Sequence, residues 1–160
     1  MKREPTTTTT TADRRGGRSG MTRDEIVAFF ERRRELYDDF DAAALAADYA
    51  DDAVIDSPIA GVHAGRLAAE QALRAVFAAF LDRKMTTESL LIDDDRVAQV
   101  LTIAGTNMGE LMGLPPTGKP FRFTAVFLYD LKDRHIVRER RIYDFTGLLV
   151  QIGVLKAKPA

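Results

Sequence analysis

Residues 121–144 read FRFTAVFLYDLKDRHIVRERRIYD, and this stretch predicts two paired strands. Every second position from Phe121 to Tyr129 is aromatic except Ala125, and such alternation places these residues on one face of a strand. The charged stretch LKDR at 131–134 is typical of a hairpin turn. We therefore expect an antiparallel hairpin with strands at 121–130 and 135–144.

Helices are expected on the N-terminal side of this hairpin. A capping-box pattern, Thr22 with Glu25, begins the first helix, whose apolar residues fall on one face. Asp41 is a second N-cap and begins a short helix. A short strand and an Ala-rich third helix are expected next, at 51–58 and 66–81.

The hydrophobic period then changes to that of strands. We expect strands at 85–92 and 97–106, a loop at 109–120 that is rich in Pro and Gly, and a terminal helix at about 146–152. Helices followed by antiparallel strands indicate the α+β class, with the helices packed on one face of a curved sheet. A pocket between the two layers is a common place for a small ligand.

The composition is that of one globular domain. The chain has 160 residues, of which 46% are hydrophobic and 29% charged. It contains no cysteine, which excludes disulfides and thiolate metal sites. No apolar run reaches the length of a membrane span, so we expect a cytoplasmic protein without a membrane partner.

The first 21 residues are expected to be a disordered leader ahead of a single domain at 22–160. The leader is rich in Thr, Arg and Gly, has a net positive charge and lacks the apolar segment of a signal peptide. The rest of the chain is mildly acidic, which argues against nucleic acid as a partner.

Three stretches together resemble the SnoaL-like polyketide cyclases, or ester cyclases, of the nuclear transport factor 2-like superfamily. They are GTNMGELMGLPPTGKP at 105–120, IVRERRIYD at 136–144 and GLLVQIGVL at 147–155. The resemblance covers about residues 22–155. It implies a cone-shaped, antiparallel or mixed sheet packed against N-terminal helices.

The resemblance also implies a reaction. Family members close a ring on aromatic polyketide methyl esters by intramolecular aldol condensation, without metal or cofactor. Their acid/base is an aspartate at the end of the last strand, which corresponds here to Asp144. The usual His of the Gly-Thr-His pattern is replaced by Asn107, a candidate hydrogen-bond donor to a developing oxyanion. The alternative is that Asn107 only satisfies backbone groups at a strand end.

The residues themselves allow two roles for Asp144. In an apolar cavity the carboxyl would be partly desolvated, and one group would then take and give a proton. Alternatively, Asp144 caps the terminal helix. The two histidines, His63 and His135, are far apart and accompany no ligand cluster, so we predict no metal.

Other candidates would contact a small hydrophobic, polycyclic aromatic substrate. Phe123 and Phe127 would stack on it, although ordinary core packing explains them equally. Tyr37 and Tyr49 would place hydroxyls at the pocket mouth, or be core residues with a wet tip. Arg140 would bind substrate, or pair with an acid across the sheet or at a subunit contact.

Two rival functions compete with the cyclase. The stretch YADDAVIDSPIAG at 49–61 resembles the region of ketosteroid isomerases that holds their catalytic Asp, but that Asp aligns with Ser57. Asp56, one residue earlier, would face the opposite side of the strand unless a bulge re-aims it. The rivals are thus an isomerase or hydratase that uses Asp56, and a non-catalytic ligand-binding or dimerisation module. We also expect a homodimer or homotetramer that assembles through the outer face of the sheet.

Overall fold

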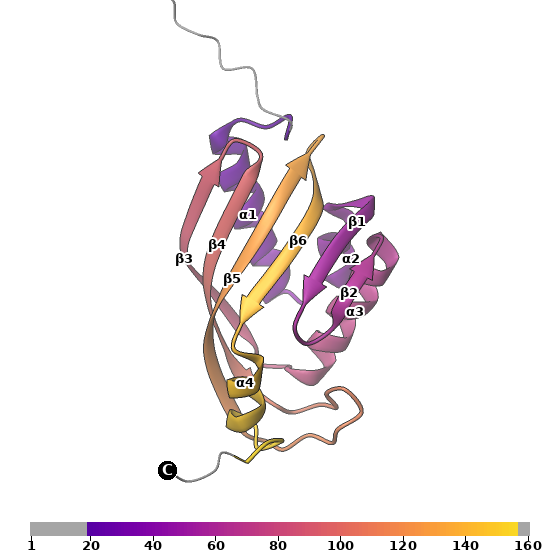
Figure 1. Ribbon diagram of the computed structural model, residues 1–160, viewed down its shortest axis with the longest axis vertical. Coiled ribbons are helices and arrows are strands. Elements are labelled where there is room, and N and C mark those ends of the chain that lie inside the picture. The colour runs from indigo at the N-terminus through magenta and orange to yellow at the C-terminus, as the bar shows by residue number, and fades with distance from the viewer. Residues whose placement is uncertain (1–18, 157–160) are drawn as a thin grey trace, which may run out of the picture.

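Six strands form one curved, mixed sheet in the order β2-β1-β6-β5-β4-β3, as Figure 1 shows. The computed structural model describes residues 19–156. All neighbouring strands are antiparallel except β1 and β6, which run parallel. The strands are β1 (Tyr49–Ser57), β2 (Gly61–Ala64), β3 (Lys84–Asp93), β4 (Arg96–Thr106), β5 (Pro120–Lys132) and β6 (His135–Tyr143).

The predicted hairpin is the centre of the sheet. Strands β5 and β6 pair in a register that places Ala125 opposite Tyr143, and the aromatic residues of β5 turn toward the helices. The turn is tighter than expected, because β5 continues to Lys132, whereas β6 begins at His135 as predicted. Asp133 and Arg134 form it with positive φ angles of 48° and 65°. Two such residues match the twist of the flanking strands.

Three helices cover the inner face of the sheet and a fourth follows the last strand (Figure 1). The predicted capping box is present, since Thr22 accepts from the Glu25 amide and Glu25 accepts from the Thr22 amide. The third helix ends two residues earlier than expected, because Phe80 leaves the helical region of φ and ψ. The helices are α1 (Arg23–Asp38), α2 (Ala42–Ala47), α3 (Arg66–Ala79) and α4 (Phe145–Gln151).

The packed chain begins earlier than the predicted boundary at residue 22. Ser19 and Met21 are buried, and the Ser19 carbonyl accepts a hydrogen bond of 2.7 Å from the Arg134 amide. The remainder of the predicted leader, residues 1–18, lies outside the described residues. Within 19–156, no helix combines the length and the apolar character that crossing a membrane requires.

The outer face of the sheet carries exposed apolar side chains. Leu91, Leu128 and Ile142 are 62%, 37% and 47% exposed. A second copy of the chain would cover them, so assembly through this face stays a prediction.

The long loop between β4 and β5, residues 107–119, is fastened to the end of α3. The amides of Met108 and Gly109 both donate to the Ala79 carbonyl, at 3.1 and 3.0 Å. Leu111 is buried and anchors the middle of the loop. The loop is therefore fixed both by backbone hydrogen bonds to the end of α3 and by the burial of the Leu111 side chain.

Candidate active site

A cavity of about 50 Å³ lies between the helices and the inner face of the sheet. Most of its walls are apolar side chains from α3, β4, β5 and α4, and the polar side chains that reach it are Tyr37, Arg83, Arg141 and Tyr143. A water molecule takes about 30 Å³ of liquid volume, so this space is small. Pockets for drug-sized ligands start at about 300 Å³, and a polycyclic substrate therefore requires the wall side chains to move apart.

The cavity has an aromatic wall, as the alternation of β5 predicts. Phe123 and Phe127 both line it. Phe123 stacks between Phe121 and Tyr143, with ring centroids 5.8 and 5.0 Å apart and interplanar angles of 28°. Burial raises the pKa of the Tyr143 phenol, so this hydroxyl keeps its proton at neutral pH and is available as a donor.

Tyr37 reaches the cavity from α1, in the region that the sequence indicates. Its side chain is buried, and within residues 19–156 its hydroxyl has no hydrogen-bond partner. A buried hydroxyl without a partner is unfavourable by about 1–3 kcal/mol. The arrangement thus leaves a polar group free to meet a ligand, and the binding role of Tyr37 stays a prediction.

Arg141 places a cation in the cavity wall. Its Nε donates to Glu139 Oε1 at 2.5 Å, and its guanidinium carbon lies 4.9 Å from the centroid of the Phe127 ring. Burial by itself lowers the pKa of Arg141, but the Glu139 carboxylate and the Tyr37 and Tyr49 phenols together outweigh this effect and hold the pKa well above its usual value. Arg141 is therefore permanently charged and held in a fixed position.

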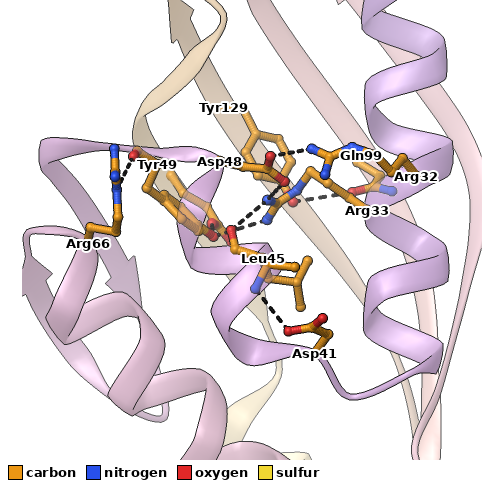
Figure 2. A network of polar contacts seen from close by, with 11 residues as sticks. Arg32, Arg33, Asp41, Leu45, Asp48, Tyr49, Arg66, Gln99 and Tyr129 are labelled. Carbon is orange, nitrogen blue, oxygen red and sulfur yellow. Dashed lines mark hydrogen bonds and ion pairs between the residues drawn. The ribbon is translucent and has the colours of Figure 1, made fainter.

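Glu139 connects this cation to a buried polar network that extends to α1. Glu139 is fully buried and also accepts from the Tyr49 hydroxyl. Figure 2 shows Arg33 reaching from α1 toward Tyr49 and Asp48, to which it donates at 3.2 and 2.8 Å. We call these five residues, Arg33, Asp48, Tyr49, Glu139 and Arg141, the buried network.

The position of Tyr49 corrects one expectation. Its hydroxyl belongs to the buried network and does not reach the cavity, so its predicted place at the pocket mouth is wrong. The reason lies in α1, where Arg33 is only 1% exposed and needs oxygen partners. Arg33 belongs to the charged stretch ERRR at 31–34, so its burial is a tertiary effect that the local sequence does not indicate.

Arg83 is a second cation in the cavity wall, located between α3 and β3. It is 7% exposed, and its guanidinium carbon lies 4.6 and 5.1 Å from the ring centroids of Phe77 and Tyr37. Burial lowers the pKa of Arg83 to about 10, which leaves it protonated at neutral pH. Its hydrogen bonds go to the Tyr37 carbonyl at 3.3 Å and the Met85 sulfur at 3.2 Å.

Asp144 does not face the dry cavity that its predicted role requires. Its side chain is exposed, and its Oδ1 accepts from the Gly147 amide at 2.7 Å as the N-cap of α4. Tyr143 takes the last inward position of β6, so the next residue turns outward and begins the helix. The expected apolar environment is therefore wrong, and an acid/base role for Asp144 has no support from its position.

Asn107 is buried, and its side-chain amide makes three hydrogen bonds within the loop. Its Nδ2 donates to the Gly109 carbonyl at 3.0 Å, and its Oδ1 accepts from the amide and hydroxyl of Thr117 at 3.0 and 3.1 Å. It does not line the cavity. The observed contacts are those of the alternative role, in which Asn107 satisfies loop groups, and its position gives no support to a role as oxyanion donor.

Asp56 and Arg140 lie together on the outer face of the sheet. They are register partners on the parallel strands β1 and β6, and Arg140 Nε is 3.9 Å from Asp56 Oδ2. The pairing of β1 with β2 runs without a bulge from Val54 to Ser57, so nothing re-aims Asp56 inward. Neither residue therefore lines the cavity between the helices and the sheet, and this position gives no support to a role in substrate contact or to an isomerase that uses Asp56.

No metal site is evident among the described residues, where no group of three His, Asp or Glu side chains could hold an ion. His63 and His135 lie on β2 and at the start of β6, as separate side chains. The polar side chains that line the cavity are those of arginine and tyrosine.

Comparison with known families gives a match over most of the chain. The family model described as SnoaL-like polyketide cyclase matches residues 28–152. Nogalonic acid methyl ester cyclase from Streptomyces nogalater is 31% identical over 129 residues, which are 80% of this chain and 91% of that protein.

Solved structures of similar proteins share the fold. IdmH from Streptomyces antibioticus, a proposed polyketide cyclase, has a TM-score of 0.64 and 30% identity over 75% of this chain and 92% of its own. AclR from Streptomyces galilaeus, a proposed hydroxylase, has a TM-score of 0.74 and 24% identity over 86% of this chain and 87% of its own. One architecture thus accompanies more than one proposed reaction.

Proposed function

Because the chain belongs to the SnoaL-like polyketide cyclase family, we propose that it is a cyclase-type enzyme that acts on a small hydrophobic polyketide in the cavity beside Arg141. The observation that carries the proposal is this permanently charged guanidinium, held by Glu139 against an aromatic wall. A fixed cation in a site that excludes water stabilises developing negative charge strongly.

The reaction we propose is an intramolecular aldol condensation without a cofactor. A base from the solvent removes a proton from a carbon next to one carbonyl group, because no carboxylate or imidazole of residues 19–156 lines the cavity. The resulting enolate carbon forms a bond to the carbon of a second carbonyl, whose oxygen gains the electron pair and then takes a proton, so no atoms are lost. Arg141 would stabilise the enolate or alkoxide oxygen, and the Tyr143 hydroxyl would donate the final proton and recover one from the solvent.

The proposal predicts that the charge at position 141 is needed for turnover. Replacing Arg141 alone would leave Glu139 buried without a partner, so the variant to use is Arg141→Met combined with Glu139→Met. We expect this double variant to fold and to lose at least about 100-fold in kcat, the usual loss when one oxyanion donor is removed. The assay uses an aromatic polyketide with two carbonyl groups, supplied as the free acid and as the methyl ester. Chromatography measures the rate at which the ring-closed product forms.

The matched control for this experiment is Arg140→Met, because Arg140 is one residue away on the same strand and faces outward. Wild-type turnover is expected for the control. The proposal is contradicted if wild-type protein closes neither substrate, or if the double variant closes one at an undiminished rate.

Asp144 is tested separately as the acid/base. Its capping geometry leads us to expect that Asp144→Asn keeps both stability and turnover, since Asn is an equally good N-cap. Asp144→Ala should lower the free energy of unfolding by about 1 kcal/mol, because the Gly147 amide loses its acceptor. Urea denaturation and the same turnover assay check both variants.

The opposite pattern would restore the original assignment. An Asp144→Asn variant with unchanged stability but at least about 100-fold less turnover would establish Asp144 as the proton carrier. Such a result would also require the Asp144 carboxylate to leave the Gly147 amide and to enter the cavity. Tyr143 and Leu148, which are close to Asp144 in the sequence, already line this cavity.

A further inference from the structure

We infer that Arg83 recognises an anionic group on the ligand, and that the cavity selects planar aromatic carboxylates over the corresponding neutral esters. The inference deepens the proposed function, on which it rests for the location of the site. It assigns a substrate class, the free acid, in place of the methyl esters that the family resemblance implies, and a specificity-determining residue that the motifs of the chain do not indicate.

The first evidence is the unfinished hydrogen bonding of Arg83. A guanidinium has five N–H donors. Here one donates to a backbone carbonyl and one to a thioether sulfur, which is a weak acceptor, while the buried Nε has no partner among residues 19–156. Within the same residues no carboxylate oxygen lies within 4.0 Å of the Arg83 guanidinium.

The second evidence is the contrast with the other buried arginines. Arg33 is paired with Asp48, and Arg141 is paired with Glu139. Arg83 instead lies against the rings of Phe77 and Tyr37, whose faces attract a cation but do not neutralise it. An unpaired buried cation is unfavourable, and an anion that enters the cavity would form an ion pair with Arg83 and compensate its charge.

The chemistry of the walls defines the rest of the ligand. Aromatic side chains from α3, β5 and β6, namely Phe80, Phe121, Phe123 and Tyr143, suit a flat ring. A guanidinium binds a carboxylate with two parallel hydrogen bonds, and a methyl ester cannot accept them as an anion. The free Tyr37 hydroxyl is available as an additional donor. The space of about 50 Å³ suits the carboxylate itself, and the ring would enter as the wall side chains move.

The test compares an acid with its ester. Binding of 2-naphthoate and of methyl 2-naphthoate is measured by titration calorimetry at pH 7 for wild-type protein, Arg83→Met and the control Arg140→Met. We expect wild-type protein and the control to bind the carboxylate at least about tenfold more tightly than the ester. In Arg83→Met this preference should disappear.

A second readout follows the charge on the ligand. The carboxylate carbon of 2-naphthoate, labelled with ¹³C, is titrated in the complex by NMR. A guanidinium beside a carboxylate lowers the carboxylate pKa, so the bound pKa should be lower in wild-type protein than in Arg83→Met. A purely structural role for Arg83 would not produce this difference.

Folding of the variants is checked by thermal unfolding. Arg83→Met removes an unpaired buried charge, so its midpoint should equal or exceed that of wild-type protein. If Arg83→Met fails to fold, Arg83→Lys is used instead. Lysine keeps the positive charge but cannot form two parallel hydrogen bonds to a carboxylate, so we expect a reduced preference for the acid.

Two results would overturn the inference: equal binding, or no binding, of the two naphthalene compounds by wild-type protein, and an unchanged preference in Arg83→Met. Neither depends on turnover. Loss of ring closure with an intact acid preference would contradict the proposed function alone, and ring closure without an acid preference would contradict this inference alone.

Discussion

Glu139→Gln is expected to lower the free energy of unfolding by about 3–5 kcal/mol, the usual result of breaking a buried ion pair from one side. Glu139 is fully buried between the Arg141 guanidinium and the Tyr49 hydroxyl. Glutamine keeps the shape but removes the negative charge, so Arg141 is left as an uncompensated cation in the core. Urea denaturation at pH 7 measures the loss.

The same substitution at an exposed glutamate separates the cost of breaking the buried ion pair from the effect of replacing Glu by Gln. Glu35→Gln removes a carboxylate whose side chain is 66% exposed and 3.8 Å from Arg34, and it should change stability by less than about 1 kcal/mol. The Glu139→Met and Arg141→Met double variant should recover most of the loss seen in Glu139→Gln. A loss below about 1 kcal/mol in Glu139→Gln would show that the buried network does not hold the core together.

Gly109→Ala is expected to detach the 107–119 loop and to lower the free energy of unfolding by about 3 kcal/mol. A Cβ at this position would lie 2.9 Å from the Ala78 carbonyl carbon and 3.0 Å from the Ala79 Cα, and closer still to the Ala78 oxygen. These are backbone atoms of α3 and cannot rotate away. The loop must withdraw, and the two hydrogen bonds to the Ala79 carbonyl are then lost.

Gly113→Ala is the appropriate comparison in the same loop. Its Cβ would meet nothing within 4 Å, but its φ of 77° is left-handed, so only backbone strain of about 1–2 kcal/mol applies. Limited proteolysis should cut the loop of Gly109→Ala faster than that of Gly113→Ala. Equal stability and equal cleavage of the two variants would contradict the close packing of Gly109 on α3.

The fold follows from local patterns that the sequence displays openly. The alternation between Phe121 and Tyr129 depends only on the two-residue period of a strand, and it correctly predicts both the central hairpin and the aromatic wall. The capping box at Thr22 is equally local. Element ends are less predictable, because the continuation of β5 to Lys132 depends on its pairing with His135 of β6.

The site is less predictable because its charges are buried by partners distant in the chain. The sequence allows Asp144 to be either an acid in an apolar cavity or the N-cap of the terminal helix, and its observed position is that of the N-cap. Arg83 stands after the third helix among ordinary polar residues, and nothing local indicates that aromatic rings surround it. One signal was available: Glu139 and Arg141 share a strand face with Tyr143, opposite the exposed Arg138 and Arg140.

The parallel pairing of β1 with β6 has a consequence for how the chain is made in the cell. The Tyr49 hydroxyl meets its carboxylate partner 90 residues further along the chain. A nascent chain that has only reached the end of α3 has neither that partner nor a sheet on which α1 can lie. Folding of this domain must therefore wait until β6 has been synthesised, and the apolar faces of the helices made first stay uncovered until then.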